Sequence, residues 1–177
     1  MEGRDDQHEN VLGVHVAPWV DWGSDQSRGR MTVRIQLQVM GIRIVRLGSE
    51  RTHHEGLRIG TVRRPPRGVP KREFSSRNFY DVWLPNLAPS EALLKQGLAV
   101  TDERGWSAFA RRYRAEMKAP DAARVLDTLA ALSHQTNFSV GCYCADESHC
   151  HRSLLRELLV ERGASVEPGG RALTSDA

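Results

Sequence analysis

The chain has 177 residues, of which 40% are hydrophobic and 27% are charged, and its net charge is +3. A chain of this length can bury the core of one ordinary globular domain, and so small a positive charge does not by itself indicate nucleic-acid binding. No run of 18 apolar residues is present, so we expect none of these residues to span a membrane.

The first ten residues, MEGRDDQHEN, are polar and acidic and lack the basic start and apolar middle of a signal peptide. We therefore expect a cytoplasmic location. Three cysteines, Cys142, Cys144 and Cys150, are the only ones in the sequence. An odd number at such close spacing makes a poor disulfide framework, so we expect reduced thiols.

Residues 1–39 are predicted to form an N-terminal extension. Residues 1–10 have the composition of a disordered segment, whereas residues 31–39, MTVRIQLQV, alternate apolar and polar side chains as a strand does. Two interpretations stay open. Either this region is a hairpin appended to the domain, or the reading frame is over-long and starts naturally at Met31 or Met40.

From residue 40 onward, short strands are predicted over 41–48 and 57–64. The next segment, 65–78, has three prolines and is predicted to be a loop, because proline is excluded from helix interiors and central strands. Residues 79–89 are predicted to be extended. The loop is long for a compact domain, which favours a functional role.

Basic residues crowd this loop and its flanks. They are Arg63, Arg64, Arg67, Lys71, Arg72 and Arg77. Such residues can bind the phosphates of a nucleotide or nucleic acid, and the aromatic residues over 74–83 can stack on bases. The simpler interpretation is a solvated charged loop. Arg67, beside Gly68, is the expected specific anion contact.

Three helices are predicted between residues 90 and 135. Ser90 is expected to cap the first and Gly97 to end it, while Thr101 is expected to cap the second. Pro120 is expected to end the second helix, and Asp121 to cap the third. The second helix carries an apolar stripe at a spacing of three or four residues. The stripe consists of Trp106, Phe109, Tyr113 and Met117.

A strand over 137–144, a helix over 150–163 and a short strand over 164–168 complete the pattern, and residues 169–177 are expected to form a loose tail. This order predicts an α/β fold, with a small mixed or mostly parallel sheet flanked by helices in a single domain over 40–168.

The segment CYCADESHCHRS, residues 142–153, holds all three thiols. On a strand, Cys142 and Cys144 point to the same face, and Cys144 lies at the carboxyl end, where open α/β sheets bind ligands. Cys150, His151 and Arg152 then open a helix, at which free N–H groups and the positive end of the dipole gather. Asp146 or Ser148 is expected to cap this helix.

One hypothesis is an anion pocket with a reactive thiol. Its predicted catalytic residues are Cys150, His151 and Cys144, and its predicted anion-binding residues are Arg152, Arg67, Lys71 and Ser90. A thiol at a helix N-terminus ionises readily, and arginine binds a phosphate or carboxylate bidentately. The layout is similar to that of thiol phosphatases and rhodaneses. However, the span from Cys144 to Arg152 has no glycine, and it contains Asp146 and Glu147, which would oppose an anion.

A second hypothesis is a metal site, since C-x-C-x5-C-H offers soft ligands that suit zinc. If a metal is present, we expect Cys144, Cys150, His149 and His151 to hold it. The C-x-C spacing differs from the usual C-x2-C, and no second pair follows. The simplest interpretation of Cys142 is a small core residue.

Four segments occur in the order and spacing of a known family: PPRGVPK, VWLPNLAPS, WSAFARRYRAEM and CYCADESHCHRSLL. Over about residues 41–165 the chain resembles the YeaO-like bacterial proteins, catalogued as domain of unknown function 488. Pro65 stands where that family usually has tryptophan, and residues 1–39 have no counterpart. The residues that match the family's pattern are Arg67, Gly68, Lys71, Trp83, Pro89, Ser90, Tyr113 and Glu116. Cys144, Cys150, His151 and Arg152 match the C-A-E and C-H-R segments of a sister branch.

The resemblance implies a small α/β domain whose basic loop and C-H-R segment face one cleft, and it implies no established activity. We expect a small-molecule-binding protein or enzyme that acts on an anionic or phosphorylated ligand through a Cys/His/Arg site at a strand-to-helix junction. The alternative is a non-enzymatic module, either zinc-stabilised or nucleic-acid binding.

Overall fold

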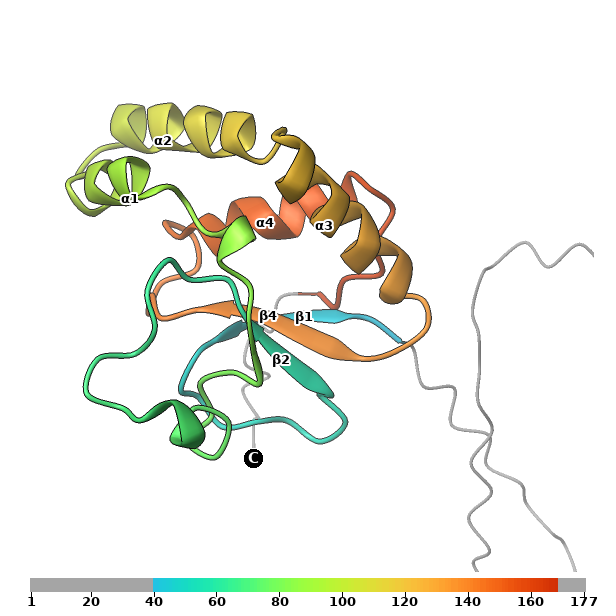
Figure 1. The fold of residues 1–177 in the computed structure, drawn as a ribbon. Helices are drawn as coiled ribbons and strands as arrows, with labels where there is room; N and C mark the ends of the chain where they lie inside the picture. The colour runs from blue at the N-terminus through green and yellow to red at the C-terminus, as the bar shows by residue number, and fades with distance from the viewer. Residues whose placement is uncertain (1–39, 169–177) are drawn as a thin grey trace, which may run out of the picture.

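A computed structural model describes residues 40–168 (Figure 1). The predicted N-terminal extension, 1–39, and tail, 169–177, lie outside the described residues. Four strands form one sheet in the order β1-β4-β2-β3, and all of its pairs are parallel. The strands are β1 (Ile42–Arg46), β2 (Leu57–Gly60), β3 (Val82–Trp83) and β4 (Phe138–Cys142). The prediction of an α/β domain with a mostly parallel sheet is confirmed.

The central strand is β4, which pairs with β1 on one side and with β2 on the other. All five of its residues are buried, as expected for a strand covered on both faces, and Val140 lies between Ile44 and Ile59. The strand ends at Cys142, two residues before the predicted end at Cys144. Residues after Cys142 are therefore free to turn away from the sheet.

The helices lie together on one side of the sheet in Figure 1, and most of the length of the segments that join β1, β2 and β3 lies on the other side. The helices are α1 (Glu91–Leu98), α2 (Glu103–Glu116), α3 (Pro120–Leu132) and α4 (His151–Val160), and 3-10 turns occur at Lys71–Glu73 and Pro85–Leu87. The apolar stripe predicted for α2 is confirmed, because Phe109, Tyr113 and Met117 are buried and Trp106 packs against the same core.

Several helix boundaries differ from the predictions. Gly97 lies inside α1, which continues to Leu98. Asp102 rather than Thr101 caps α2, because its carboxylate accepts from the N–H of Gly105 at 2.7 Å. Helix α3 begins at Pro120, where a missing N–H costs nothing, so Asp121 lies in its first turn and is not its cap.

On the side of the sheet away from the helices, Arg58 of β2 is fully buried. Its Nε donates to Glu55 at 2.6 Å, and its Nη1 donates to the carbonyl oxygens of Ser49 and Asn78 at 2.8 and 2.7 Å. Burial alone would raise the pKa of Glu55, but hydrogen bonds from Arg58 and Ser139 lower it. This ion pair holds the two long connections against the sheet.

Candidate functional site

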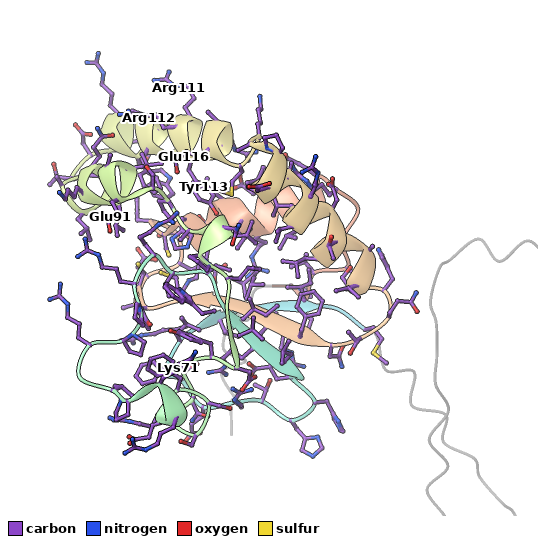
Figure 2. All side chains as sticks on the ribbon, viewed as in Figure 1. Lys71, Glu91, Arg111, Arg112, Tyr113 and Glu116 are labelled. Carbon is purple, nitrogen blue, oxygen red and sulfur yellow. The ribbon has the colours of Figure 1, made fainter. Side chains whose placement is uncertain are left out.

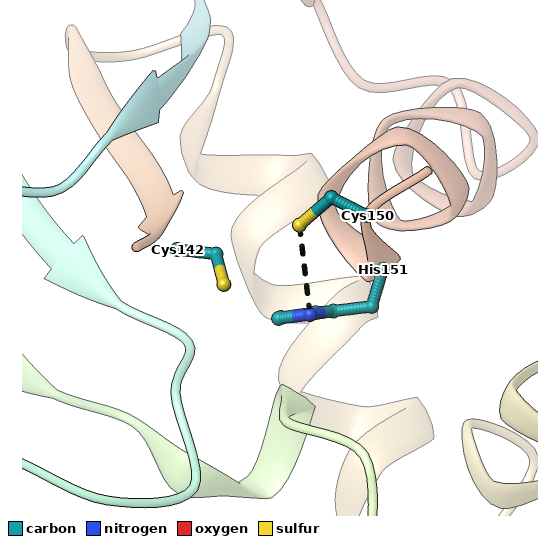
Figure 3. A group of neighbouring side chains, drawn as sticks. All are labelled: Cys142, Cys150 and His151. Atoms are coloured by element: carbon teal, nitrogen blue, oxygen red, sulfur yellow. Dashed lines mark hydrogen bonds between the residues drawn. The ribbon is translucent and has the colours of Figure 1, made fainter. Parts of the chain in front are cut away.

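The carboxyl ends of the parallel strands meet at one edge of the sheet, and the connection from β4 to α4 crosses that edge. Figure 3 shows Cys142 at the end of β4, with Cys150 and His151 facing it from the start of α4. Ligands bind at this edge of open α/β sheets. Because β4 is the central strand, the three side chains lie in the middle of the edge.

Four possible metal-binding atoms gather here. The Sγ atoms of Cys142 and Cys144 are 3.6 Å apart, and the Sγ of Cys150 is 3.9 Å from Nδ1 of His151. The ligand atoms of Cys142, Cys150 and His151 all lie within 4.8 Å of one another. These three residues are buried, with 6%, 2% and 5% of their surface exposed, whereas Cys144 is exposed. We call these four residues the thiol–imidazole cluster.

The orientation of the His151 ring is set by the sheet. Its Nε2 lies 2.8 Å from the carbonyl oxygen of Thr61, the residue after β2. Thr61 is itself held to Gly141 of β4 by its N–H and its hydroxyl, both at 3.0 Å. A carbonyl oxygen can only accept, so Nε2 carries the ring proton and Nδ1 turns a lone pair toward Cys150.

The pKa values of the three thiols are shifted in different directions. Hydrogen bonds from Cys142 and from Cys150 lower the pKa of the Cys144 thiol, and the positive charge of Arg152 acts in the same direction. The pKa values of Cys142 and Cys150 are raised, because their thiols donate within the cluster and are buried. Burial also lowers the pKa of His151, which favours the neutral imidazole.

Arg152 is buried beside the cluster, with 3% of its surface exposed. Its Nη1 and Nη2 donate to the carbonyl oxygens of Val45 and Ala145, both at 3.2 Å, while its buried Nε has no partner among residues 40–168. A buried cation whose only partners are neutral carbonyls needs negative charge nearby. The Arg152 guanidinium therefore supplies a buried positive charge that acts on the thiol of Cys144.

The acidic residues between the cysteines are engaged elsewhere. Glu147 accepts from Arg156 at 2.7 Å, and Asp146 accepts from the N–H and hydroxyl of Ser148. Neither Asp146 nor Ser148 caps α4, contrary to the prediction, because the N-cap is Cys150 and has no side-chain capping bond. The N–H groups at the start of α4 are therefore left without a side-chain cap.

His149 points away from the cluster. Its Nδ1 lies 3.3 Å from Asp146, its ring packs edge-on against Trp106, and more than half of its side chain is exposed. Of the four metal ligands predicted from the sequence, the structure brings Cys150 and His151 together, and the third member of this compact set is Cys142. Cys144 lies beside Cys142, and His149 lies apart.

The basic loop is not joined to the cluster by side-chain bonds. Arg67 and Lys71 are exposed, and among residues 40–168 neither side chain makes a hydrogen bond or an ion pair. Figure 2 shows Lys71 on the side of the sheet opposite to Tyr113 and Glu116. Anion or nucleic-acid binding by these two residues stays a prediction.

Ser90 has structural partners. Its hydroxyl caps α1 by accepting from Leu93 and also donates to Glu116, whose carboxylate accepts from the N–H of Ser90 at 2.8 Å. Tyr113 is fully buried and donates to the carbonyl oxygen of Leu87 at 2.7 Å. These contacts fasten α1 and α2 to the segment before them, and an anion-binding role for Ser90 stays a prediction.

Sequence reasoning missed two members of this site. Cys142 is buried, as a core residue would be, yet its sulfur meets that of Cys144. The sequence pattern that indicates this contact is the alternation of side chains along a strand, which places Cys142 and Cys144 on the same face. Thr61 contributes only a backbone oxygen, for which no sequence pattern exists.

No helix in the described part of the chain is long and apolar enough to cross a membrane. Neither the curated proteins nor the solved structures contain a match to this chain. One family model, described as the active DUF488-N3 subclade, matches residues 42–163, about two thirds of the chain. That span includes the four strands, the four helices and the whole thiol–imidazole cluster. The chain therefore belongs to the DUF488 family, within which it matches the subclade described as active.

Proposed function

We propose that this protein binds one Zn²⁺ through the Sγ atoms of Cys142, Cys144 and Cys150 and through Nδ1 of His151. The spacing of these atoms carries the proposal. In a tetrahedral site with Zn–S near 2.3 Å, two sulfurs lie about 3.8 Å apart, and a sulfur and a nitrogen about 3.6 Å apart. The Sγ atoms of Cys142 and Cys144 are 3.6 Å apart, and the Sγ of Cys150 is 3.9 Å from Nδ1 of His151. The ligand atoms of Cys142, Cys150 and His151 lie within 4.8 Å of one another.

The surroundings of the ligands support the same proposal. Histidines that bind metals almost always donate their other ring N–H to a carbonyl or carboxylate, which is the bond that His151 makes to Thr61. The backbone N–H groups of Cys144 and Arg152 lie close to the sulfurs of Cys142 and Cys150. Donors of this kind stabilise sulfur in its charged form.

Charge balance favours a metal as well. Three thiolates and one Zn²⁺ carry a net charge of −1, and the guanidinium of Arg152 supplies +1 from a buried position. Three thiolates so close together, two of them buried, would repel one another without a metal. Zinc binding would join the end of β4 to the start of α4, so part of its binding free energy would stabilise the fold.

Metal analysis of protein purified without chelators tests the proposal. We expect one zinc per chain, with Cys142→Ser, Cys150→Ser and His151→Ala each removing it. His149→Ala is the matched control, because His149 is next to the cluster in sequence but points away from it, and this variant should keep its zinc. Co²⁺ substitution should give the strong thiolate-to-metal absorption of a tetrahedral sulfur site. A folded wild-type protein that binds neither metal would refute the proposal.

A second candidate function is thiol chemistry at Cys144 on a small anionic molecule. It is favoured by the exposure of Cys144, the one accessible thiol of the cluster, and by the positive charge of Arg152 nearby. In this case metal-free protein should be alkylated by iodoacetamide rapidly and selectively at Cys144. Equal and slow labelling of all three cysteines would contradict it.

A further inference from the structure

We propose that Cys144 is a displaceable ligand of the zinc and that a small organic anion with a thiolate donor takes its place. This inference rests on the proposed zinc centre. In the exchange, the bond between zinc and the Cys144 sulfur would break and the sulfur of the incoming thiol would form the new bond to zinc, while the proton of that thiol passes through water to the Cys144 sulfur. The protein would then hold the metal through three ligands, and the incoming anion would occupy the fourth position.

Exposure separates Cys144 from the other three ligands. Cys142, Cys150 and His151 are at least nine-tenths buried, whereas Cys144 faces solvent. Their ligand atoms already form a compact set of three, all within 4.8 Å of one another. Catalytic zinc sites are built in this way, from three protein ligands, including the Cys₂His type, and a fourth exchangeable position. Displacing Cys144 would therefore leave a set of ligands that can still hold the metal.

The backbone position of Cys144 also differs from that of the other three proposed ligands. Cys142 is the last residue of β4 and is paired with Arg46 of β1. His151 belongs to the first turn of α4, and Cys150 is its N-cap. Cys144 lies in the irregular connection between these two elements. Only the Cys144 ligand can move off the metal without disturbing a strand or a helix.

The positive charge of Arg152 favours an anionic incoming ligand. Arg152 is buried, its Nε has no partner, and its Nη2 donates to the carbonyl oxygen of Ala145, the residue after Cys144. The guanidinium therefore lies on the Cys144 side of the cluster. Any thiolate that replaces Cys144 restores the charge at the metal. A carboxylate on the same ligand would in addition be attracted to the guanidinium, whose Nε–H has no partner among the described residues, so an anionic thiol is favoured over a neutral one.

Cys144→Ala in the Co²⁺-substituted protein tests the inference, with Cys142→Ala as the matched variant. The Cys144→Ala protein should keep one Co²⁺ per chain, and its thiolate-to-metal absorption should fall by about one third because one of three sulfurs is gone. The Cys142→Ala protein should lose the metal, because the buried set of three is broken.

Mercaptoacetate and 2-mercaptoethanol are the two probes, one anionic and one neutral, each with a thiol donor. Mercaptoacetate should restore the lost absorption of the Cys144→Ala protein with saturation and bind at least about tenfold more tightly than 2-mercaptoethanol. Equal affinities would overturn the preference for anions. Loss of Co²⁺ from Cys144→Ala as complete as from Cys142→Ala would overturn the displaceable ligand while leaving the zinc centre standing. Wild-type protein without bound metal would instead refute the zinc centre itself.

Discussion

Nε2 of His151 donates to the carbonyl oxygen of Thr61 across 2.8 Å and thereby links the first turn of α4 to the residue after β2. This bond leads to the first prediction, that the neutral His151 ring is protonated at Nε2 alone. Long-range ¹H–¹⁵N NMR correlations should show this single tautomer, and zinc should shift Nδ1 while Nε2 keeps its proton. The exposed ring of His149 is the internal control. Protonation at Nδ1 of His151 would contradict the assignment.

Tyr113 provides the second prediction. Its hydroxyl is fully buried and donates to Leu87, so Tyr113→Phe should lower the free energy of unfolding by about 1–3 kcal/mol by leaving that carbonyl oxygen without its partner. Tyr143→Phe is the comparison, because in the described part of the chain the buried hydroxyl of Tyr143 has no partner within hydrogen-bond distance, so its removal should cost little. Urea denaturation measures both, and equal losses would count against the proposed role of the Tyr113 bond.

The third prediction concerns the ion pair of Arg58 and Glu55. Arg58→Met should destabilise the fold by about 3–5 kcal/mol, because Glu55 would remain buried without its charged partner. Arg124→Ala removes a cation from an ion pair whose side chains are 79% and 86% exposed, and it should leave stability unchanged within error. Thermal and urea unfolding distinguish the two cases. An Arg58→Met protein as stable as wild type would show that the buried pair is not needed.

Asp81 provides the fourth prediction, a pH dependence. Burial would raise its pKa, but hydrogen bonds from Arg51, Ser75 and the N–H of Arg58 lower the pKa from 3.8 to about 2. Because the folded pKa lies below the unfolded one, this contribution to stability is fully present above pH 3.8. It is lost as the pH falls toward about 2.

The variant that measures this effect is Asp81→Asn. Allowing for the partial exposure of Asp81 and Arg51, we expect the wild type to be more stable by about 1–2 kcal/mol at pH 6, and the difference to shrink steadily below pH 3.8. Urea titrations of both proteins at several pH values provide the measurement. A difference that is constant from pH 6 to pH 2.5 would contradict the role of Asp81.

Much of the fold could be predicted from local patterns. The strand over 41–48, the apolar stripe of α2 and the leucine-rich helix α4 each follow from side-chain spacing within a few turns or residues. Helix ends were predicted less well, because two neighbouring residues can compete for the same cap. Thr101 and Asp102 are such a pair, and the carboxylate of Asp102 makes the capping bond.

The sequence by itself determined that thiols, imidazole and guanidinium gather where β4 leads into α4, because all of them lie within twelve residues. Only the tertiary structure decided how they are used. It placed Cys142 rather than His149 beside Cys150 and His151, and it brought the carbonyl oxygen of Thr61, the residue after β2, to His151. It also left Cys144 as the exposed member of the three thiols. The reason is physical: spacing along the chain determines which face a side chain takes, whereas contact between elements depends on strand order, register and the path of the loops.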